Sequence, residues 1–162
     1  MKKINCIAID DEPLALELTK SNLAKISFIE LKGTFLNVKK AREFLSKNKI
    51  DLLFLDIQMP GITGMEFAKT MDESMMVVFT TAYEKYAMEG FEVNAVDYLL
   101  KPVSNERFKK ACEKAFEIFE WRNREKVNDF IFINSEHRVI KIYLKDILYV
   151  EVYVFKVKWT IC

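Results

Sequence analysis

The chain has 162 residues, 51% of them hydrophobic, but no apolar run reaches the roughly 18 residues of a membrane span, and the short run after Met1-Lys2-Lys3 does not resemble a signal peptide. Its 25 Lys and Arg residues nearly balance 24 Asp and Glu residues, and the net charge of +1 does not indicate a nucleic-acid-binding surface. With one histidine, the chain is a poor candidate for a histidine-rich metal site or a Ser/His triad. Its three cysteines lack metal-ligand or redox spacing, which fits a reducing cytosol. We therefore expect a cytoplasmic protein with no membrane partner.

The first two-thirds of the chain alternates short apolar runs with amphipathic stretches, which is typical of βα units around a parallel sheet. Two of the runs are apolar at nearly every position, as expected for strands covered on both faces. The pattern predicts five strands, at Ile4–Ile9, Phe28–Phe35, Leu52–Leu55, Met75–Thr80 and Asp97–Leu100.

Five amphipathic stretches follow these strands in alternation. The first begins at Pro13, a residue suited to the first position of a helix, and Leu14, Leu18 and Leu23 follow one face of it. The alternation predicts an α/β domain over residues 1–122 with a doubly wound five-stranded parallel sheet. The other predicted helices are Val38–Asn48 with Asn37 as its cap, Met65–Met71 after Gly64, Glu84–Phe91, and a fifth that is capped by Ser104 and ends near Arg122.

The periodicity changes after a charged linker at residues 123–129. Phe130–Asn134 and Val139–Leu144 read as two strands, with a hairpin turn at Ser135–Arg138 between them. Ile147–Trp159 reads as a third strand-like region. We expect residues 130–162 to form a short all-β fragment, because three strands without a covering helix bury little surface.

Polar residues stop four of the apolar runs at the predicted carboxyl ends of the strands. They are Asp10-Asp11, Asp56, Thr80-Thr81 and Lys101-Pro102. Because ligands of open α/β sheets gather at these strand ends, we expect the four groups to meet in one crevice. The alternative is that they are unrelated strand-terminal residues.

Acidic side chains forced together suggest a cation. Two carboxylates a few ångströms apart repel by roughly 1–4 kcal/mol, and an oxygen-only donor set without histidine favours Mg²⁺. Asp56 stands alone at its strand end and is the candidate nucleophile for an acyl phosphate, while Asp10 and Asp11 are better suited to holding the metal. Lys101 would neutralise phosphoryl oxygens, and the Thr81 hydroxyl could donate to one of them.

These motifs resemble those of a known family. The elements Asp10-Asp11-Glu12, Asp56-Ile57-Gln58-Met59-Pro60-Gly61, Thr81-Ala82 and Lys101-Pro102 are similar to the receiver domain of bacterial two-component response regulators, over about residues 3–122. The resemblance implies the flavodoxin-like receiver fold. It also implies a regulator that promotes its own Mg²⁺-dependent phosphorylation and dephosphorylation and is not a dedicated enzyme.

The resemblance assigns roles to individual residues. Asp56 would accept phosphate from a phosphohistidine of a sensor histidine kinase, and Thr81 and Lys101 would contact the phosphoryl group. Thr81 fits better than Thr80 because the small residue Ala82 follows it. Mg²⁺ would be held by Asp10, Asp11, Asp56 and the main-chain carbonyl of Gln58.

Switching is also implied by the resemblance. Tyr98 occupies the place of an aromatic side chain that moves inward when the threonine approaches the phosphate, although a half-buried strand tyrosine is the simpler interpretation. A cis peptide is usual in the family at the position of Lys101-Pro102, and Gly61 and Gly64 would permit turns below Asp56. The parent family forms homodimers through the face of the fourth helix, fifth strand and fifth helix.

Two stretches resemble the LytR/AgrA branch of the family more specifically, Phe79–Ala87 and Ala95–Pro102. That branch carries a LytTR-type DNA-binding domain, whose opening strands residues 130–151 resemble. The chain supplies only part of such a domain over residues 130–162, Val152–Phe155 runs on without the turn that the family has, and Trp159–Cys162 matches nothing in it. DNA would be a partner only if the domain is complete.

Three functions are therefore compared. The first is a phosphorylation-controlled response regulator that acts on transcription through its LytTR-type part. The second is a stand-alone receiver that serves as a phosphate sink or protein-binding module without DNA contact, which the shortened C-terminal part favours. An aspartate-dependent phosphatase of the haloacid dehalogenase type is the third, but Gln58 stands where that class needs a second aspartate.

Overall fold

The computed structural model describes residues 2–83, 95–123, 130–135, 138–153 and 156–161. The chain divides into two compact units, Met1–Arg122 and Asn123–Cys162. The predicted helix Glu84–Phe91 lies outside the described residues.

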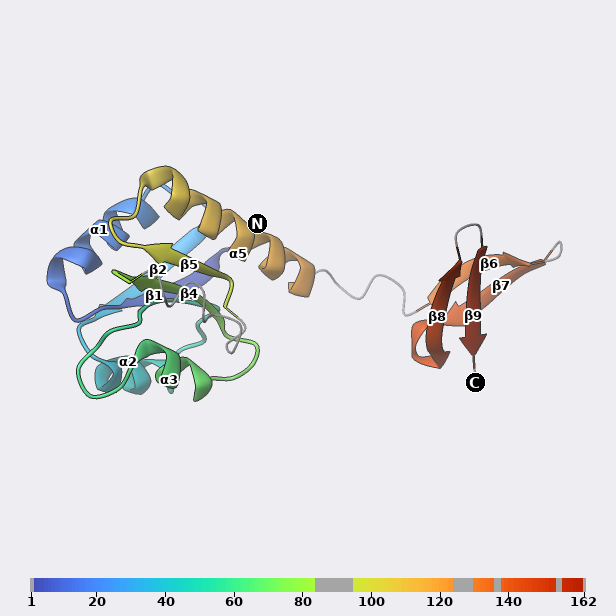
Figure 1. The fold of residues 1–162 in the computed structure, drawn as a ribbon, viewed down its shortest axis with the longest axis horizontal. Helices are drawn as coiled ribbons and strands as arrows, with labels where there is room; N and C mark the ends of the chain where they lie inside the picture. The colour runs from blue at the N-terminus through green and yellow to red at the C-terminus, as the bar shows by residue number, and fades with distance from the viewer. Residues whose placement is uncertain (1, 84–94, 124–129, 136–137, 154–155, 162) are drawn as a thin grey trace. The chain divides into compact units, whose positions relative to one another are not determined.

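The first unit is built on a parallel sheet with the strand order β2-β1-β3-β4-β5 (Figure 1). Every residue of β3 is buried because helices cover the sheet on both faces, which is the reason for its unbroken apolar sequence. The five strands start and end within one residue of the predicted bounds. They are β1 (Ile4–Ile9), β2 (Ile29–Phe35), β3 (Leu52–Asp56), β4 (Met76–Thr81) and β5 (Asp97–Leu100).

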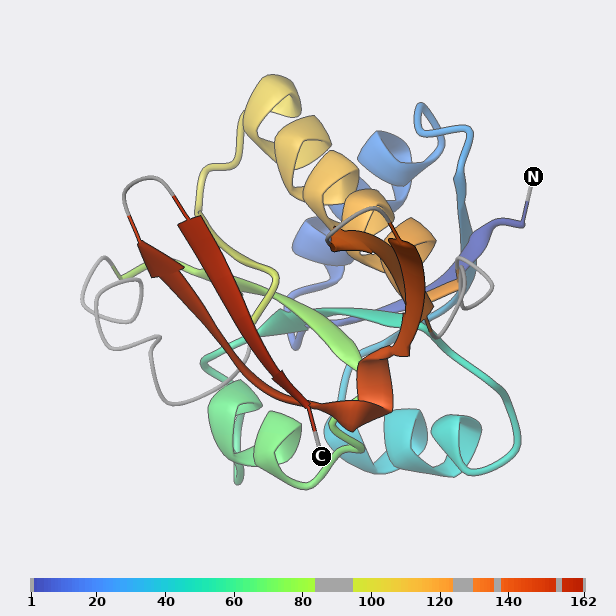
Figure 2. The ribbon, with the colours of Figure 1, turned by 90° about the vertical axis from the view of Figure 1, so that its right-hand side faces the viewer.

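The described helices cover both faces of this sheet. Helices α1 (Pro13–Leu23) and α5 (Asn105–Asn123) pack on one face, and α2 (Val38–Leu45) and α3 (Gly64–Lys69) pack on the other (Figures 1 and 2). Each face has its own apolar core. The predicted doubly wound five-stranded α/β fold is therefore confirmed.

The predicted apolar face of α1 is wrong for two of its three leucines. Leu14 and Leu18 are 79% and 67% exposed, whereas Leu16 and Leu23 are buried against the sheet. Four leucines are spread around this helix, so apolar spacing alone did not identify the face that docks. Pro13 does stand at the start of the helix, as predicted.

Two helices on the other face are shorter than predicted. The cap of α2 is Asn37, whose side chain accepts the Lys40 N–H at 3.1 Å, but the helix ends at Leu45. There the Ser46 and Asn48 side chains donate to the last helical carbonyls, which ends the main-chain pattern. Helix α3 begins at Gly64 and ends at Lys69, where residues 65–71 were predicted.

Helix α5 is fixed at both of its ends. Ser104 caps it as predicted, because its hydroxyl accepts the Arg107 N–H at 3.2 Å. At the other end the Arg122 guanidinium donates to the carbonyl of Ser74, just before β4, at 2.6 Å. The helix therefore runs along the sheet between two side-chain contacts.

The second unit contains two antiparallel hairpins. Strands β6 (Phe130–Ser135) and β7 (Arg138–Tyr143) pair as predicted for the first hairpin. The prediction of a single third strand is wrong, since a short 3₁₀ helix (Leu144–Asp146) leads into β8 (Ile147–Tyr153), which pairs with β9 (Lys156–Ile161). The sequence between β8 and β9 has no glycine, proline or asparagine to mark a turn.

Candidate functional site

Three strand ends bring the predicted charged residues together. Asp56 is the last residue of β3, Asp10 directly follows β1, and Lys101 directly follows β5. The Asp10 N–H donates to the Phe35 carbonyl at 3.1 Å, which fixes the end of β1 against β2. Both carboxylates are buried, with 5% of Asp10 and 4% of Asp56 exposed.

The Lys101 ammonium bridges the two carboxylates. Its Nζ atom lies 2.8 Å from Asp10 Oδ2 and 2.7 Å from Asp56 Oδ1. Two buried acids at this separation would repel strongly without a positive charge between them. The ammonium therefore offsets part of the repulsion between the two acids in the crevice.

Burial and charge act in opposite directions on these groups. Burial raises the pKa of Asp56 above its ordinary value, although Lys101 opposes the shift. Burial alone would lower the pKa of Lys101, but its hydrogen bonds to Asp10 and Asp56 outweigh this and raise it. The lysine therefore stays charged, while Asp56 is a less well stabilised, more basic carboxylate.

The two threonines end β4 beside this cluster. Thr81 is 1% exposed, and its hydroxyl accepts the Tyr83 N–H at 3.1 Å. The Thr81 carbonyl accepts the Lys101 N–H at 2.7 Å, so the main chains of these two site residues are directly bonded. Thr80 is 7% exposed and pairs in register with Asp56.

The two glycines of the loop that follows Asp56 have different tasks. Gly61 has a φ angle of +87°, in the left-handed region where glycine is favoured, as expected for a turn. Gly64 does not serve a turn but begins α3, and a Cβ atom there would overlap the carbonyl oxygen of Asp56. The absence of a side chain at Gly64 therefore lets α3 approach the main chain of Asp56.

The structure does not add Asp11 and Gln58 to the buried cluster. Both side chains are exposed. Within the residues that the structure describes, no three acidic, histidine or cysteine side chains form a group able to hold a metal. Asp10 and Asp56 do converge, and Mg²⁺ in proteins is commonly held by one or two carboxylates with water and phosphate oxygens. The donor chemistry of this pair therefore fits Mg²⁺.

Tyr98 is a half-buried residue of β5. Its ring stacks on the Phe79 ring with centroids 5.2 Å apart, and burial raises the pKa of its hydroxyl. The Lys101-Pro102 peptide bond is cis, which the sequence alone left open.

Sequence reasoning missed an ion pair next to this residue. Asp97 and Arg107 bind each other through two hydrogen bonds of 2.6 and 2.7 Å. An acid at the start of a strand and an arginine in the first turn of the next helix are signals for such a contact, but their spacing of ten residues matches no local pairing rule.

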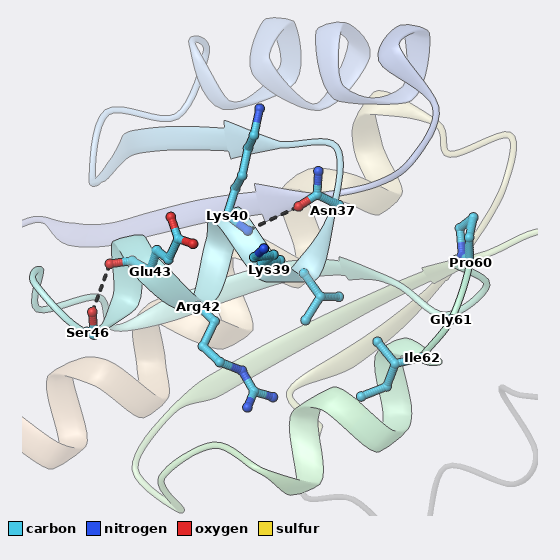
Figure 3. A pocket seen from close by; sticks show the side chains of 10 residues that line it. Asn37, Lys39, Lys40, Arg42, Glu43, Ser46, Pro60, Gly61 and Ile62 are labelled. Atoms are coloured by element: carbon cyan, nitrogen blue, oxygen red, sulfur yellow. Dashed lines mark hydrogen bonds between the residues drawn. The ribbon is translucent and has the colours of Figure 1, made fainter.

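An open groove of about 960 Å³ lies elsewhere, between α2 and the loop Pro60–Ile62 (Figure 3). Lys39, Lys40 and Arg42 are among its lining residues. The Arg42 guanidinium already lies over the Phe67 ring, 5.5 Å from its centroid. Neither acid of the buried cluster lines the groove, so it is separate from the site at the strand ends.

Comparison with known families identifies the first unit. A family model for the response regulator receiver domain matches residues 6–113. The chain belongs to the response regulator receiver family. This receiver domain carries Asp10, Asp56 and Lys101 at the carboxyl ends of its strands, where the ends of the apolar runs predicted them.

Two relatives and one solved structure show the extent of the similarity. An uncharacterized response regulatory protein of Vibrio vulnificus (strain CMCP6) is 42% identical over 113 residues, which cover 68% of this chain and 47% of the relative. The transcriptional regulatory protein BtsR of Escherichia coli (strain K12) is 34% identical over 159 residues, covering 91% of this chain and 65% of BtsR. The chain thus spans less than two-thirds of the length of these relatives.

The response regulatory domain of protein mrkE from Klebsiella pneumoniae shares the fold of the receiver domain. It superimposes with a TM-score of 0.67 at 31% sequence identity, covering 73% of this chain and 99% of the mrkE domain.

Among the helices that the structure describes, none combines the length and the apolar character needed to cross a membrane.

Proposed function

We propose that the receiver domain accepts a phosphoryl group on Asp56 from a phosphohistidine of a sensor histidine kinase. The observation that carries this proposal is the buried Asp56 carboxylate, which shares the Lys101 ammonium with Asp10. Burial raises the pKa of Asp56, so the charges of the protein stabilise its carboxylate only in part. The site also supplies a cation beside the atom that would react.

The transfer is a displacement at phosphorus. A carboxylate oxygen of Asp56 forms the new O–P bond, and the electrons of the breaking P–N bond pass to the imidazole, which is protonated as it leaves. Lys101 neutralises charge on the phosphoryl oxygens, and we assign the Thr81 hydroxyl as a donor to one of them.

Mg²⁺ would be held by Asp10 and Asp56, and we assign Asp11 and the main-chain carbonyl of Gln58 to the same ion. When bound, the ion supplies positive charge against the phosphoryl oxygens. Asp10 is already oriented for this, because its Oδ1 accepts the Glu12 N–H at 3.0 Å while its Oδ2 faces Lys101.

Phosphorylation is proposed to change the conformation of the Thr81 and Tyr98 region. The altered surface would be that of β5, α5 and the predicted helix Glu84–Phe91, which lies outside the described residues, and we propose that a homodimer forms through it. The output is proposed to be transcriptional control through a LytTR-type DNA-binding domain, to which residues 130–162 would belong. The similarity to BtsR over 91% of the chain supports this assignment.

The phosphoacceptor is tested by incubating the full chain with a small-molecule phosphodonor and Mg²⁺ and measuring the mass by intact-protein mass spectrometry. We expect one added phosphoryl group, which is lost in Asp56→Asn and removed by hydroxylamine. Asp72→Asn is the matched control, because Asp72 is an exposed aspartate that hydrogen-bonds to Ser74 outside the cluster. Labelling of Asp56→Asn at the level of this control would reject the assignment.

Binding to DNA from the promoters that the protein controls separates the proposed output from a stand-alone receiver. Specific binding that falls steeply with salt would support the DNA-binding domain, because phosphate contacts release counterions. Absence of binding by the phosphorylated full chain would favour the stand-alone module.

A further inference from the structure

The main chain of Tyr98 lies on the open edge of the sheet, because β5 is the last strand in the order. Its polar groups are nevertheless bonded. The Tyr98 N–H donates to Asp97 Oδ1 at 2.9 Å, and the Tyr98 carbonyl accepts from Arg107 Nη2 at 3.0 Å. Edge strands ordinarily leave such groups to water or to another strand. Here the side chains of Asp97 and Arg107 bind the Tyr98 main chain instead of water or another strand.

Several hydrogen bonds fix the Arg107 side chain and main chain in position beside the Tyr98 carbonyl. Its guanidinium donates to both carboxylate oxygens of Asp97, at 2.6 and 2.7 Å, in addition to the Tyr98 carbonyl. The Arg107 N–H is itself fixed by the Ser104 hydroxyl at the start of α5. A planar guanidinium can serve these acceptors together, whereas a lysine ammonium lacks the fork.

The same strand leads directly to the phosphoacceptor site. Three residues after Tyr98, the Lys101 N–H bonds to the Thr81 carbonyl, and its ammonium lies between Asp10 and Asp56. A shift of β5 along or away from β4 would therefore move the Tyr98 ring and the Lys101 ammonium together. Arg107 and Asp97 resist that shift from the edge of the sheet.

We propose that Arg107 is a positioning residue for the Asp56 site. It fixes the main chain of β5 at Tyr98, and thereby sets both the stacking of the Tyr98 ring on Phe79 and the place of Lys101. This inference rests on the proposed phosphorylation of Asp56. Arg107 itself does not act on the phosphoryl group.

The first measurement reports on Tyr98 in the unphosphorylated full chain. Incorporation of 3-fluorotyrosine gives a ¹⁹F NMR spectrum, in which comparison with Tyr98→Phe identifies the Tyr98 signal among six tyrosines. We expect this signal to shift and broaden in Arg107→Gln. Arg107→Lys should restore it only in part, because it returns the charge without the fork.

The second measurement is the rate of Asp56 labelling by the small-molecule phosphodonor with Mg²⁺. We expect Arg107→Gln to slow labelling about tenfold, since small misplacements of a charged group beside a reacting atom cost one to two orders of magnitude in rate. Lys110→Gln is the control, because Lys110 forms an exposed ion pair with Glu106 on the same helix. It should leave the signal and the rate unchanged.

Three results would overturn the proposal. Arg107→Gln could match Lys110→Gln in both measurements, or it could alter the Tyr98 signal while the labelling rate stays unchanged. If Arg107→Gln does not fold, Asp97→Ala removes the carboxylate that holds the guanidinium and the Tyr98 N–H, and normal labelling of that variant would also overturn the proposal. Absence of labelling in the unaltered chain would instead reject the proposed function, so the two failures can be told apart.

Discussion

Two carboxylate–cation contacts of the receiver domain lie at opposite ends of β5, and they differ in how their charges are balanced. Lys101 divides its ammonium between two buried acids, Asp10 and Asp56. Arg107 instead gives its guanidinium to the single carboxylate of Asp97 and to a main-chain carbonyl. The first contact has more negative charge than positive, while the second is balanced.

The pKa shifts of the two acids have opposite signs for this reason. Burial raises the pKa of Asp56, and its share of Lys101 does not cancel the effect. Burial also acts to raise the pKa of Asp97, but the hydrogen bonds from Arg107 and from the Tyr98 N–H outweigh it and lower the pKa. A carboxylate that is left partly uncompensated is available for a metal or a phosphoryl group, whereas a fully bonded one holds the structure.

Removal of Lys101 should have the largest effect on stability. In Lys101→Met, two buried acids lose their positive charge, and we expect the free energy of unfolding at neutral pH to fall by about 2–3 kcal/mol. Mg²⁺ should restore part of the loss by supplying positive charge, and acidification should reduce the loss as Asp56, whose pKa is raised by burial, becomes protonated. Urea unfolding with and without Mg²⁺ measures both effects.

The control for this variant is Lys109→Met, which removes only a 3.6 Å exposed ion pair with Glu113. If the two variants lose the same free energy, or if Mg²⁺ does not distinguish them, Lys101 is not compensating a buried excess of negative charge.

A substitution at Gly64 tests the first contact without changing any charge. Gly64→Ala places a methyl group against the Asp56 carbonyl, and we expect a loss of about 2 kcal/mol together with slower labelling of Asp56. Gly61→Ala is the comparison, since it strains a positive φ angle but meets no atom within 4 Å. It should cost about 1 kcal/mol and leave labelling unchanged. Equal labelling of the two variants would argue against a role of Gly64 in placing Asp56.

The smallest expected effects have opposite signs in the two contacts. Because the pKa of Asp97 is lowered by folding, it stabilises the protein above the ordinary aspartate pKa and loses this contribution as the pH falls through its lowered value. Asp97→Asn should therefore cost about 1 kcal/mol at neutral pH, after allowance for the half-exposed Arg107, and nothing at acid pH.

Asp56→Asn should instead stabilise the protein at neutral pH. The pKa of Asp56 is raised by folding, so its ionised form is costly there, and the gain should disappear as the pH falls below the raised value and the native Asp56 protonates. Urea unfolding from about pH 7 to well below the ordinary aspartate pKa of about 4 measures both differences, because the Asp56 effect changes above that value and the Asp97 effect below it. If both substitutions lowered the free energy of unfolding at neutral pH, the two contacts would not differ in the way described.

The sequence was sufficient to predict the five strands of the receiver domain and the convergence of its charged residues. A run such as Leu52–Leu55 admits no solvent face, so its place inside a parallel sheet follows from composition. Asp10, Asp56 and Lys101 come together because carboxyl ends of parallel strands share one edge. Neither inference depends on side-chain detail.

Other features depended on tertiary packing that no short pattern records. The leucines of α1 occupy several faces, and only the angle at which the helix lies on the sheet selects Leu16 over Leu14. Gly64 looks like a turn residue until the distance between α3 and β3 is known. The Asp97–Arg107 contact spans the loop between β5 and α5, whose course the sequence did not reveal.

The two anchors of α5 have a mechanical consequence. Near the start of the helix, Arg107 donates to the Tyr98 carbonyl of β5, the strand that leads to Lys101. Near its end, Arg122 donates to the Ser74 carbonyl at the opposite edge of the sheet. The helix rises by about 22 Å between these two arginines. A tilt imposed at the phosphoacceptor end would strain the Arg122 contact, at the place where the chain leaves the receiver domain for its second unit.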